Sequence, residues 1–346
     1  MDKQVIGMAG VSAPMGNYNA DFSGNPRTTY SGKIFSTGFA FKRQTKDNFE
    51  AMFPGKIFGL RSYKAIQTDE GVSYSPRTLE ERYEYKFGKS IESPKKKKKN
   101  SKKNTEKDSL GEAITEEEAP ILNEKEILSN LLSCYDCRNF GLTTAVPGVN
   151  RSITGVAQIS DALDLTPDNR SERETITSSF SSDSSKKNTT VGSYAMTEEA
   201  HYFFPFDIFP NAIKSFVDDG ITTEYSDEDY NNLKSAMLSC ATQGHSRTKS
   251  PCFNEFAIFI EMDSKASRPD LRSSIHFEKV ENGRNKISFN AKSWVPELKE
   301  QILKIEVYIE PDTVEFCTDI SEFIDDLKVY DIRTNKDITK DITISK

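Results

Sequence analysis

Stretches of apolar residues, continuous or alternating with polar ones, indicate several β-strands along the chain. They predict strands at residues 4–13, 37–41, 140–146, 153–159, 253–262 and 304–310, with shorter ones near 273–280 and 286–290. Helical spacing or capping signals predict helices at residues 44–52, 123–134, 226–241 and 296–303. Because strands and helices are interspersed and antiparallel hairpins are evident, this order favours an α+β fold over a doubly wound parallel sheet.

Three polar stretches interrupt the pattern. Residues 14–27 are dense in Gly, Asn, Asp and Pro, which is typical of a loop. Residues 55–122 contain a lysine run at 95–103 and no long periodic element, so we predict a flexible Lys-rich insertion; a loop that grips phosphates is the alternative. Residues 166–195 predict a protruding hairpin, because two β-leaning segments flank a tip rich in Ser and Lys.

The net charge of −7 argues against a nucleic-acid-binding protein when it is taken alone. The charge is uneven, however, since residues 1–103 are strongly basic and residues 296–331 are acidic. A phosphate responds to the local field more than to the total charge. The charge distribution therefore permits RNA binding without arguing for it.

The sequence offers little support for an enzyme, a metal site or a cofactor. The five cysteines are an odd number at irregular spacing, and Cys134 and Cys137 form a CxxC pair without the further ligands that zinc requires. Phosphate-binding and hydrolase motifs are absent from the sequence. Asp21 and Asp136 are the acids near loops that we considered, and each residue type more often serves in turns or ion pairs. Since no apolar run is long enough to span a membrane, we expect a cytoplasmic protein without a membrane partner.

Basic residues at loops and element ends fit a single-stranded RNA ligand, which needs cations for phosphates and flat side chains for bases. The alternative is ordinary solvated surface. The residues concerned are Lys42, Arg43, Arg138, Arg151, Arg170, Arg173, Lys186, Lys187, Arg247 and Lys249.

Several segments, in this order, resemble the backbone subunits of CRISPR Cascade complexes. The first is Asn17-Tyr18-Asn19-Ala20-Asp21 with Asn25-Pro26-Arg27, and the second is Tyr135-Asp136-Cys137-Arg138-Asn139-Phe140-Gly141. The third is Ser152-Ile153-Thr154-Gly155-Val156-Ala157-Gln158-Ile159, in which Val156-Ala157 replaces a more usual Pro-Val. The aromatic block 201–210, the helix at 227–241, Ser246-Arg247-Thr248-Lys249 and the strand at 254–259 continue the resemblance. Subtype I-B looks most similar, with subtype I-C next.

This family belongs to the RAMP superfamily, so the resemblance implies an RRM-like (ferredoxin-like) palm with a finger-like insertion and a thumb β-hairpin. The palm would comprise residues 1–54, 123–165 and 196–346, the finger residues 55–122 and the thumb residues 166–195. The aromatic signature of ordinary RRM domains is not recognisable, so base stacking on the sheet is not implied.

The resemblance further implies that copies of the chain stack head to tail along one guide RNA (crRNA), with other Cascade subunits as partners. Phosphates would be held without reading sequence, and the exposed bases would pair with target DNA. The RNA contacts that we expect are Asn17, Asn19, Arg27, Lys42, Arg43, Arg138, Thr154, Gln158, Arg170, Arg173, Lys186, Lys187, Arg247 and Lys249.

Other interpretations stay open at this point. Arg138 and Asp136 could form an internal ion pair, and the aromatic block at 202–209 could be core instead of a platform for bases. Two rival functions are a type III-like RAMP subunit that cleaves target RNA through Asp21, and a self-assembling structural protein that binds no RNA.

Overall fold

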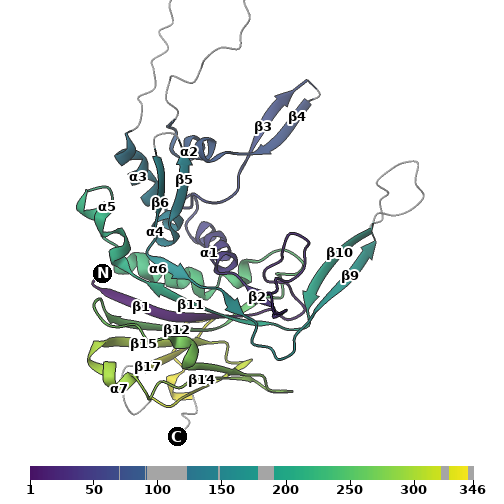
Figure 1. The fold of residues 1–346 in the computed structure, drawn as a ribbon, viewed down its shortest axis with the longest axis vertical. Coiled ribbons are helices and arrows are strands. Elements are labelled where there is room, and N and C mark those ends of the chain that lie inside the picture. Colours follow the sequence, from purple (N-terminus) through teal and green to yellow (C-terminus); the bar gives the residue numbers. More distant parts are fainter. Residues whose placement is uncertain are drawn as a thin grey trace, which may run out of the picture. The chain divides into compact units, whose positions relative to one another are not determined.

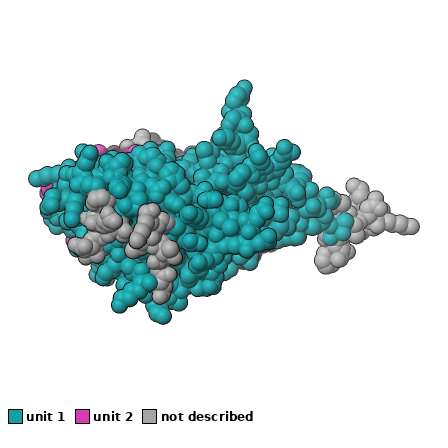
Figure 2. All heavy atoms as spheres, turned by 90° about the horizontal axis from the view of Figure 1, so that it is seen from below, with its two compact units in different colours: residues 1–54, 156–212, 224–346 teal, residues 55–155, 213–223 magenta. Residues whose placement is uncertain are grey.

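The computed structural model describes residues 1–69, 71–89, 91, 123–146, 149–177, 191–320 and 327–341. It divides into two compact units, coloured separately in Figure 2. The first comprises Met1–Pro54, Val156–Ala212 and Glu224–Lys346, and the second Gly55–Gly155 and Ile213–Thr223. Residues 123–155 thus fall in the second unit by this division, and the palm, finger and thumb boundaries stay a prediction.

A six-stranded sheet forms the centre of the first unit, in the order β17-β15-β12-β1-β11-β7. These strands are Leu327–Asp331, Ile302–Ile309, Phe253–Asp263, Lys3–Ser12, His201–Ile208 and Ala157–Ile159. All neighbours are antiparallel except β15 and β17. Most of the aromatic block noted in the sequence is strand β11, where Tyr202, Phe203, Phe204 and Phe206 are buried in the core, whereas Phe209 beyond the strand is exposed.

Both faces of this sheet are covered, as Figure 1 shows. One face packs against the smaller sheet of β13 (Ile275–Glu278), β14 (Asn285–Phe289) and β16 (Val314–Thr318). Alternate residues Phe256, Ile258 and Ile260 of β12 point into that core, as the period of a strand requires. On the opposite face lie α1 (Gly38–Met52) and α6 (Asp227–Leu238), where the rings of Phe41 and Phe204 are 5.0 Å apart.

Helix α6 begins as the sequence predicts. Ser226 Oγ accepts a hydrogen bond from the Asp229 amide at 3.0 Å, and Asp229 Oδ2 accepts one from the Ser226 amide at 2.9 Å. The strand predicted at 37–41 is wrong, because α1 starts at Gly38 with Thr37 as its N-cap. A Cβ on Gly38 would lie 2.2 Å from the Ile159 carbonyl oxygen, so this helix end packs too closely on β7 for a larger residue.

The second unit contains four helices within the described residues: α2 (Leu79–Phe87), α3 (Glu124–Leu132), α4 (Tyr135–Phe140) and α5 (Lys214–Asp218). It also contains two hairpins, of β3 (Tyr63–Thr68) with β4 (Gly71–Pro76), and of β5 (Leu142–Val146) with β6 (Val149–Ile153). Its core includes Phe58, Tyr83 and Leu131. Residues 55–122 were expected to hold no long periodic element, yet their described part contains β3, β4 and α2; the two strands are mostly exposed and the helix is mostly half-buried.

Besides short 3-10 helices, the described residues of the first unit also form β2 (Phe35–Ser36) with β8 (Ala162–Leu163), α7 (Val295–Leu298) and the hairpin of β9 (Ser171–Thr177) with β10 (Val191–Thr197). The hairpin at 171–197 extends away from the end of the sheet in Figure 1. No helix in the parts of the chain described by the structure is long and apolar enough to cross a membrane.

Candidate nucleic-acid interface

The loop after β1 is tied to its surroundings by two asparagine side chains. Asn17 is buried, and its amide nitrogen donates to the carbonyl oxygens of Gly24 at 3.1 Å and Ala195 at 3.2 Å. Asn19 Oδ1 accepts from both the backbone amide and the hydroxyl of Thr37 at 2.9 Å. These bonds fasten the loop to strand β10 and to the start of α1, and the role of either side chain in RNA binding stays a prediction.

Asp21 organises a tight turn in the same loop. Its Oδ1 accepts hydrogen bonds from the backbone amides of Ser23 at 2.8 Å and Asn25 at 2.9 Å. Its own amide donates to the Asn25 carbonyl at 2.7 Å. The bonds given by the structure are those of a turn-forming aspartate.

Two arginines lie at the base of the β9–β10 hairpin. Arg173 donates to Asn25 Oδ1 at 2.8 Å and to the Ser23 carbonyl at 3.2 Å, which links the hairpin to the loop. Arg247 donates to the Tyr194 hydroxyl at 2.7 Å, and its guanidinium lies 3.9 Å from the centre of that ring. Both arginines are exposed, so the hairpin base offers two cations on an ordered support.

The other expected contacts in the first unit differ in exposure. Lys42 is half-buried beside the Phe39 ring. The pKa of its ammonium group is lowered mainly by burial and to a smaller extent by the positive charge of nearby Lys46. Arg43 forms an exposed ion pair with Asp47 at 3.0 Å. Arg170 and Gln158 are exposed, whereas Arg27 and Lys249 are partly buried.

In the second unit Arg138 holds two segments of the chain together. It is buried and donates to Thr222 Oγ1 at 2.9 Å and to the Thr223 carbonyl at 3.0 Å. Asp136 accepts from the backbone amides of Phe58 at 2.8 Å and Gly59 at 2.6 Å. Thr154 is exposed in a loop. Lys186, Lys187 and the lysine run at 95–103 lie outside the described residues.

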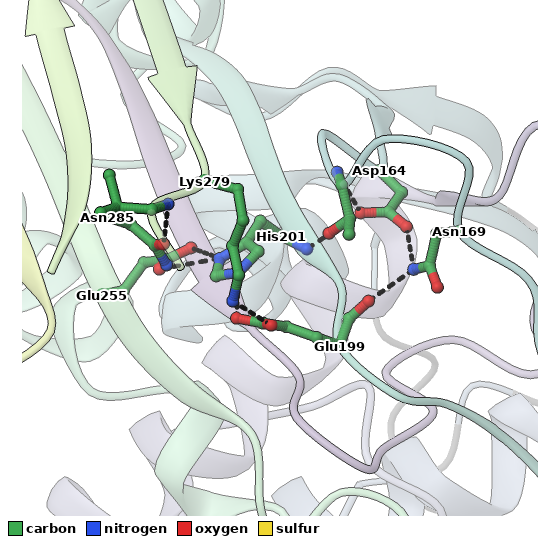
Figure 3. A network of polar contacts seen from close by, with 9 residues as sticks. Asp164, Asn169, Glu199, His201, Glu255, Lys279 and Asn285 are labelled. Carbon is green, nitrogen blue, oxygen red and sulfur yellow. Dashed lines mark hydrogen bonds and ion pairs between the residues drawn. The ribbon is translucent and has the colours of Figure 1, made fainter. Parts of the chain in front are cut away.

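A partly buried polar network, which had not been predicted from the sequence, includes residues on both sides of the β9–β10 hairpin in the sequence (Figure 3). His201 contacts Glu255 through Nδ1 at 2.8 Å and Glu199 through Nε2 at 2.8 Å, and Glu199 also pairs with Lys279. The His201 amide donates to Asp164 Oδ1 at 3.0 Å. The network therefore joins residues on both sides of the hairpin to strands β11 and β12.

The ionisation of His201 follows from this setting. Burial by itself lowers the pKa of the imidazole, but the negative charges and hydrogen bonds of Glu255 and Glu199 outweigh it and raise the pKa above the ordinary value of 6.5. Glu255 comes 54 residues after His201 in the sequence, so no local spacing signals the pair.

The described residues contain no group of three His, Cys, Asp or Glu side chains that could hold a metal ion. All five cysteines belong to the described part of the chain and are buried free thiols. Burial raises the pKa of the Cys134 thiol to about 11, which keeps it protonated.

Residues 3–294 match the sequence profile of a family described as CRISPR-associated protein Cas7. The chain belongs to the Cas7 family. This Cas7 chain is also similar to a solved chain titled "CRISPR RNA-guided surveillance complex, pre-nicking", with 11% identity, a TM-score of 0.49 and coverage of 95% of this chain and 96% of that one. For a second, "CRISPR RNA-guided surveillance complex", the identity is 11%, the TM-score 0.48 and the coverage 95% and 94%. A search of curated proteins finds no match.

The family membership confirms the resemblance found in the segments around Asn17, Tyr135, Ser152 and His201. The structure likewise has the expected mixture of helices and strands around a central sheet. The assignment of this Cas7 chain to subtype I-B stays a prediction.

Proposed function

We propose that this Cas7 chain is a guide-RNA-binding backbone subunit of a type I CRISPR Cascade complex, of subtype I-B, and that it performs no chemistry. The match of residues 3–294 to the Cas7 family carries this proposal. In the proposed assembly, copies of the chain lie head to tail on one RNA beside other Cascade subunits, and the guide bases stay available to pair with target DNA.

The proposed architecture is an RRM-like palm built on the six-stranded sheet, with the β9–β10 hairpin as thumb. The ordered cations at the hairpin base support phosphate binding there, since Arg173 and Arg247 are both exposed and both held by hydrogen bonds. Arg170 precedes the hairpin and is also exposed. Phosphate contacts carry no base identity, which suits a protein that must accept any guide sequence.

The decisive experiment is to purify the chain at low salt without nuclease, then to extract and size any RNA that remains bound. We expect guide RNA that limited ribonuclease digestion cuts into a regular ladder of protected lengths. The affinity of the chain for this RNA should fall steeply with salt concentration. For a single strand, each neutralised phosphate lowers the binding constant by about 0.7 log unit for every tenfold rise in salt.

A matched pair of charge reversals sharpens the experiment. Arg43→Glu with Arg170→Glu should abolish the protection of the RNA. The control, Arg284→Glu with Arg272→Glu, changes the charge by the same amount at exposed residues outside the expected contacts, and it should leave the protection intact. Protein that is free of nucleic acid and unable to protect guide RNA with its partners would refute the proposal and favour a structural protein. Metal-dependent RNA cleavage that is lost in Asp21→Asn would instead favour a cleaving RAMP subunit.

A further inference from the structure

Two aromatic side chains in the loop between β1 and β2 are fully exposed. Phe22 and Tyr30 have relative exposures of 106% and 111%, whereas Tyr18 in the same loop is completely buried. Each ring stands at the tip of a separate turn. An aromatic ring that is left entirely in water buries no apolar area within the chain, so both rings are accessible to a ligand.

The turns that carry these rings are ordered by their own hydrogen bonds. Asp21 closes the first turn, as described above, and the bridge between Ala20 and Pro26 flanks it. In the second turn the amide of Thr29 donates to the Lys33 carbonyl at 2.8 Å, and Thr29 Oγ1 accepts from the Lys33 amide at 3.1 Å.

Glycines complete both turns. Gly24 and Gly32 have φ values of 83° and 82°, a left-handed conformation that favours glycine. Because the turns are ordered before anything binds, a ligand that stacks on either ring orders little further chain.

A cation contacts the first turn, and another belongs to the second. Arg173 donates to the carbonyl of Ser23, the residue after Phe22. On the other turn Lys33 is exposed, and it lines an open cleft of about 670 Å³ together with Arg170. Exposed rings and cations on one surface are the combination by which proteins bind single-stranded nucleic acid, with a ring against a base and a cation on a phosphate.

We propose that Phe22 and Tyr30 are stacking platforms for unpaired bases of the RNA strand whose phosphates Arg170, Arg173 and Lys33 hold. This inference rests on the proposed function. The proposed function requires only contacts to phosphates, and the inference adds contacts to the faces of bases. Every base has a flat π-face, so two such platforms hold bases of any sequence. The rings stand singly among short polar residues, which suits a base better than the continuous apolar surface of a protein interface.

The test compares the binding of one single-stranded RNA to the full chain and to its variants. Phe22→Ala and Tyr30→Ala should each weaken binding by about 5- to 150-fold, the effect of removing one stacked base. The salt dependence should not change, because no phosphate contact is removed. Phe22→Leu keeps an apolar side chain and loses the ring, so it should weaken binding as much as Phe22→Ala does.

Two controls make the result specific. Tyr74→Ala removes a tyrosine of β4 that is also exposed but is not among the expected RNA contacts, and it should weaken binding by less than about twofold. An RNA that lacks its bases should bind to the wild type and to the double alanine variant with equal affinity. Both alanine variants should fold, since the bonds of each turn come from Asp21, Thr29 and the backbone.

The outcomes separate this inference from the proposed function. If the wild type binds no RNA, the proposed function fails and takes the inference with it. If the wild type binds RNA and the double variant binds it equally well, only the stacking platforms are refuted. A third outcome would assign the rings to a contact between copies of the chain instead. In that case Phe22→Leu behaves as wild type, and the alanine variants disrupt assembly of the chain in the absence of RNA.

Discussion

His201 and Glu255 form a buried charge pair whose disruption should be costly. The side chain of each residue is 1% exposed, so solvent screens neither charge. Glu199, the second carboxylate, is 27% exposed and also pairs with Lys279, so its contribution is smaller. Replacing His201 by Leu leaves Glu255 as a buried group without its cation, which should lower the free energy of unfolding by about 3–5 kcal/mol.

A double-mutant cycle isolates this cost. His201→Leu with Glu255→Leu removes both charges, and a buried ion pair replaced by apolar residues is often neutral or stabilising. The double variant should therefore unfold at a higher urea concentration than His201→Leu alone. The single tryptophan, Trp294, packs against the core of the same unit and reports this unfolding by fluorescence.

The same pair predicts how stability depends on pH. Because the folded protein raises the pKa of His201, the protonated form is favoured by folding. The stabilisation is complete below pH 6.5 and is lost as pH rises through the raised pKa. We therefore expect the free energy of unfolding of the wild type to decrease between neutral and alkaline pH, and that of His201→Leu not to show this decrease. A His201→Leu variant within about 1 kcal/mol of the wild type, or one with the same pH dependence, would refute the reasoning.

Three further substitutions test other parts of the fold by urea or thermal unfolding. Gly7→Ala places a Cβ 2.1 Å from the Phe206 ring and 2.3 Å from the Ile258 carbonyl oxygen, so it should cost about 1–3 kcal/mol or more; an unchanged melting temperature would contradict this close packing. Ser226→Ala removes the N-cap of α6 and should cost about 1 kcal/mol, most of which Ser226→Asp should restore. Arg138→Met removes charged hydrogen bonds to threonine and should cost about 1.5–3 kcal/mol; a cost no greater than that of an exposed Arg→Met change would rule out its structural role.

The long apolar strands and the β9–β10 hairpin could be predicted from the sequence, whereas the exposed strands β3 and β4 and the short helix α4 could not. Strand β12 is buried at nearly every position because both of its faces are covered, and its continuous apolar run at residues 256–260 gives a clear signal. Strands β3 and β4 are exposed at most positions and show no such signal. Helix α2 does have a capping box at Thr78 and Glu81, a local signal in the sequence that predicts the start of a helix.

The candidate site was predictable in part. The loop after β1 was expected from its Gly, Asn and Asp content, but Asn17 and Asn19 direct their amides to backbone and side-chain groups of the same chain. Residue type alone does not distinguish an amide that binds a ligand from one that supports a loop. The network around His201 joins strands that are neighbours only in the folded sheet. No short segment of the sequence therefore carries a signal for it.

The order of strands in the sheet has a consequence for synthesis. Strand β15 pairs with β12 along most of its length, yet it comes after residue 294, where the match to the family ends. During translation β12 therefore leaves the ribosome before β15 exists, and the edge of β12 that faces β15 stays unpaired until residues 302–309 have emerged. A nascent or prematurely terminated chain without these residues presents that edge to other nascent chains, so the synthesis of β15 removes a site of aggregation.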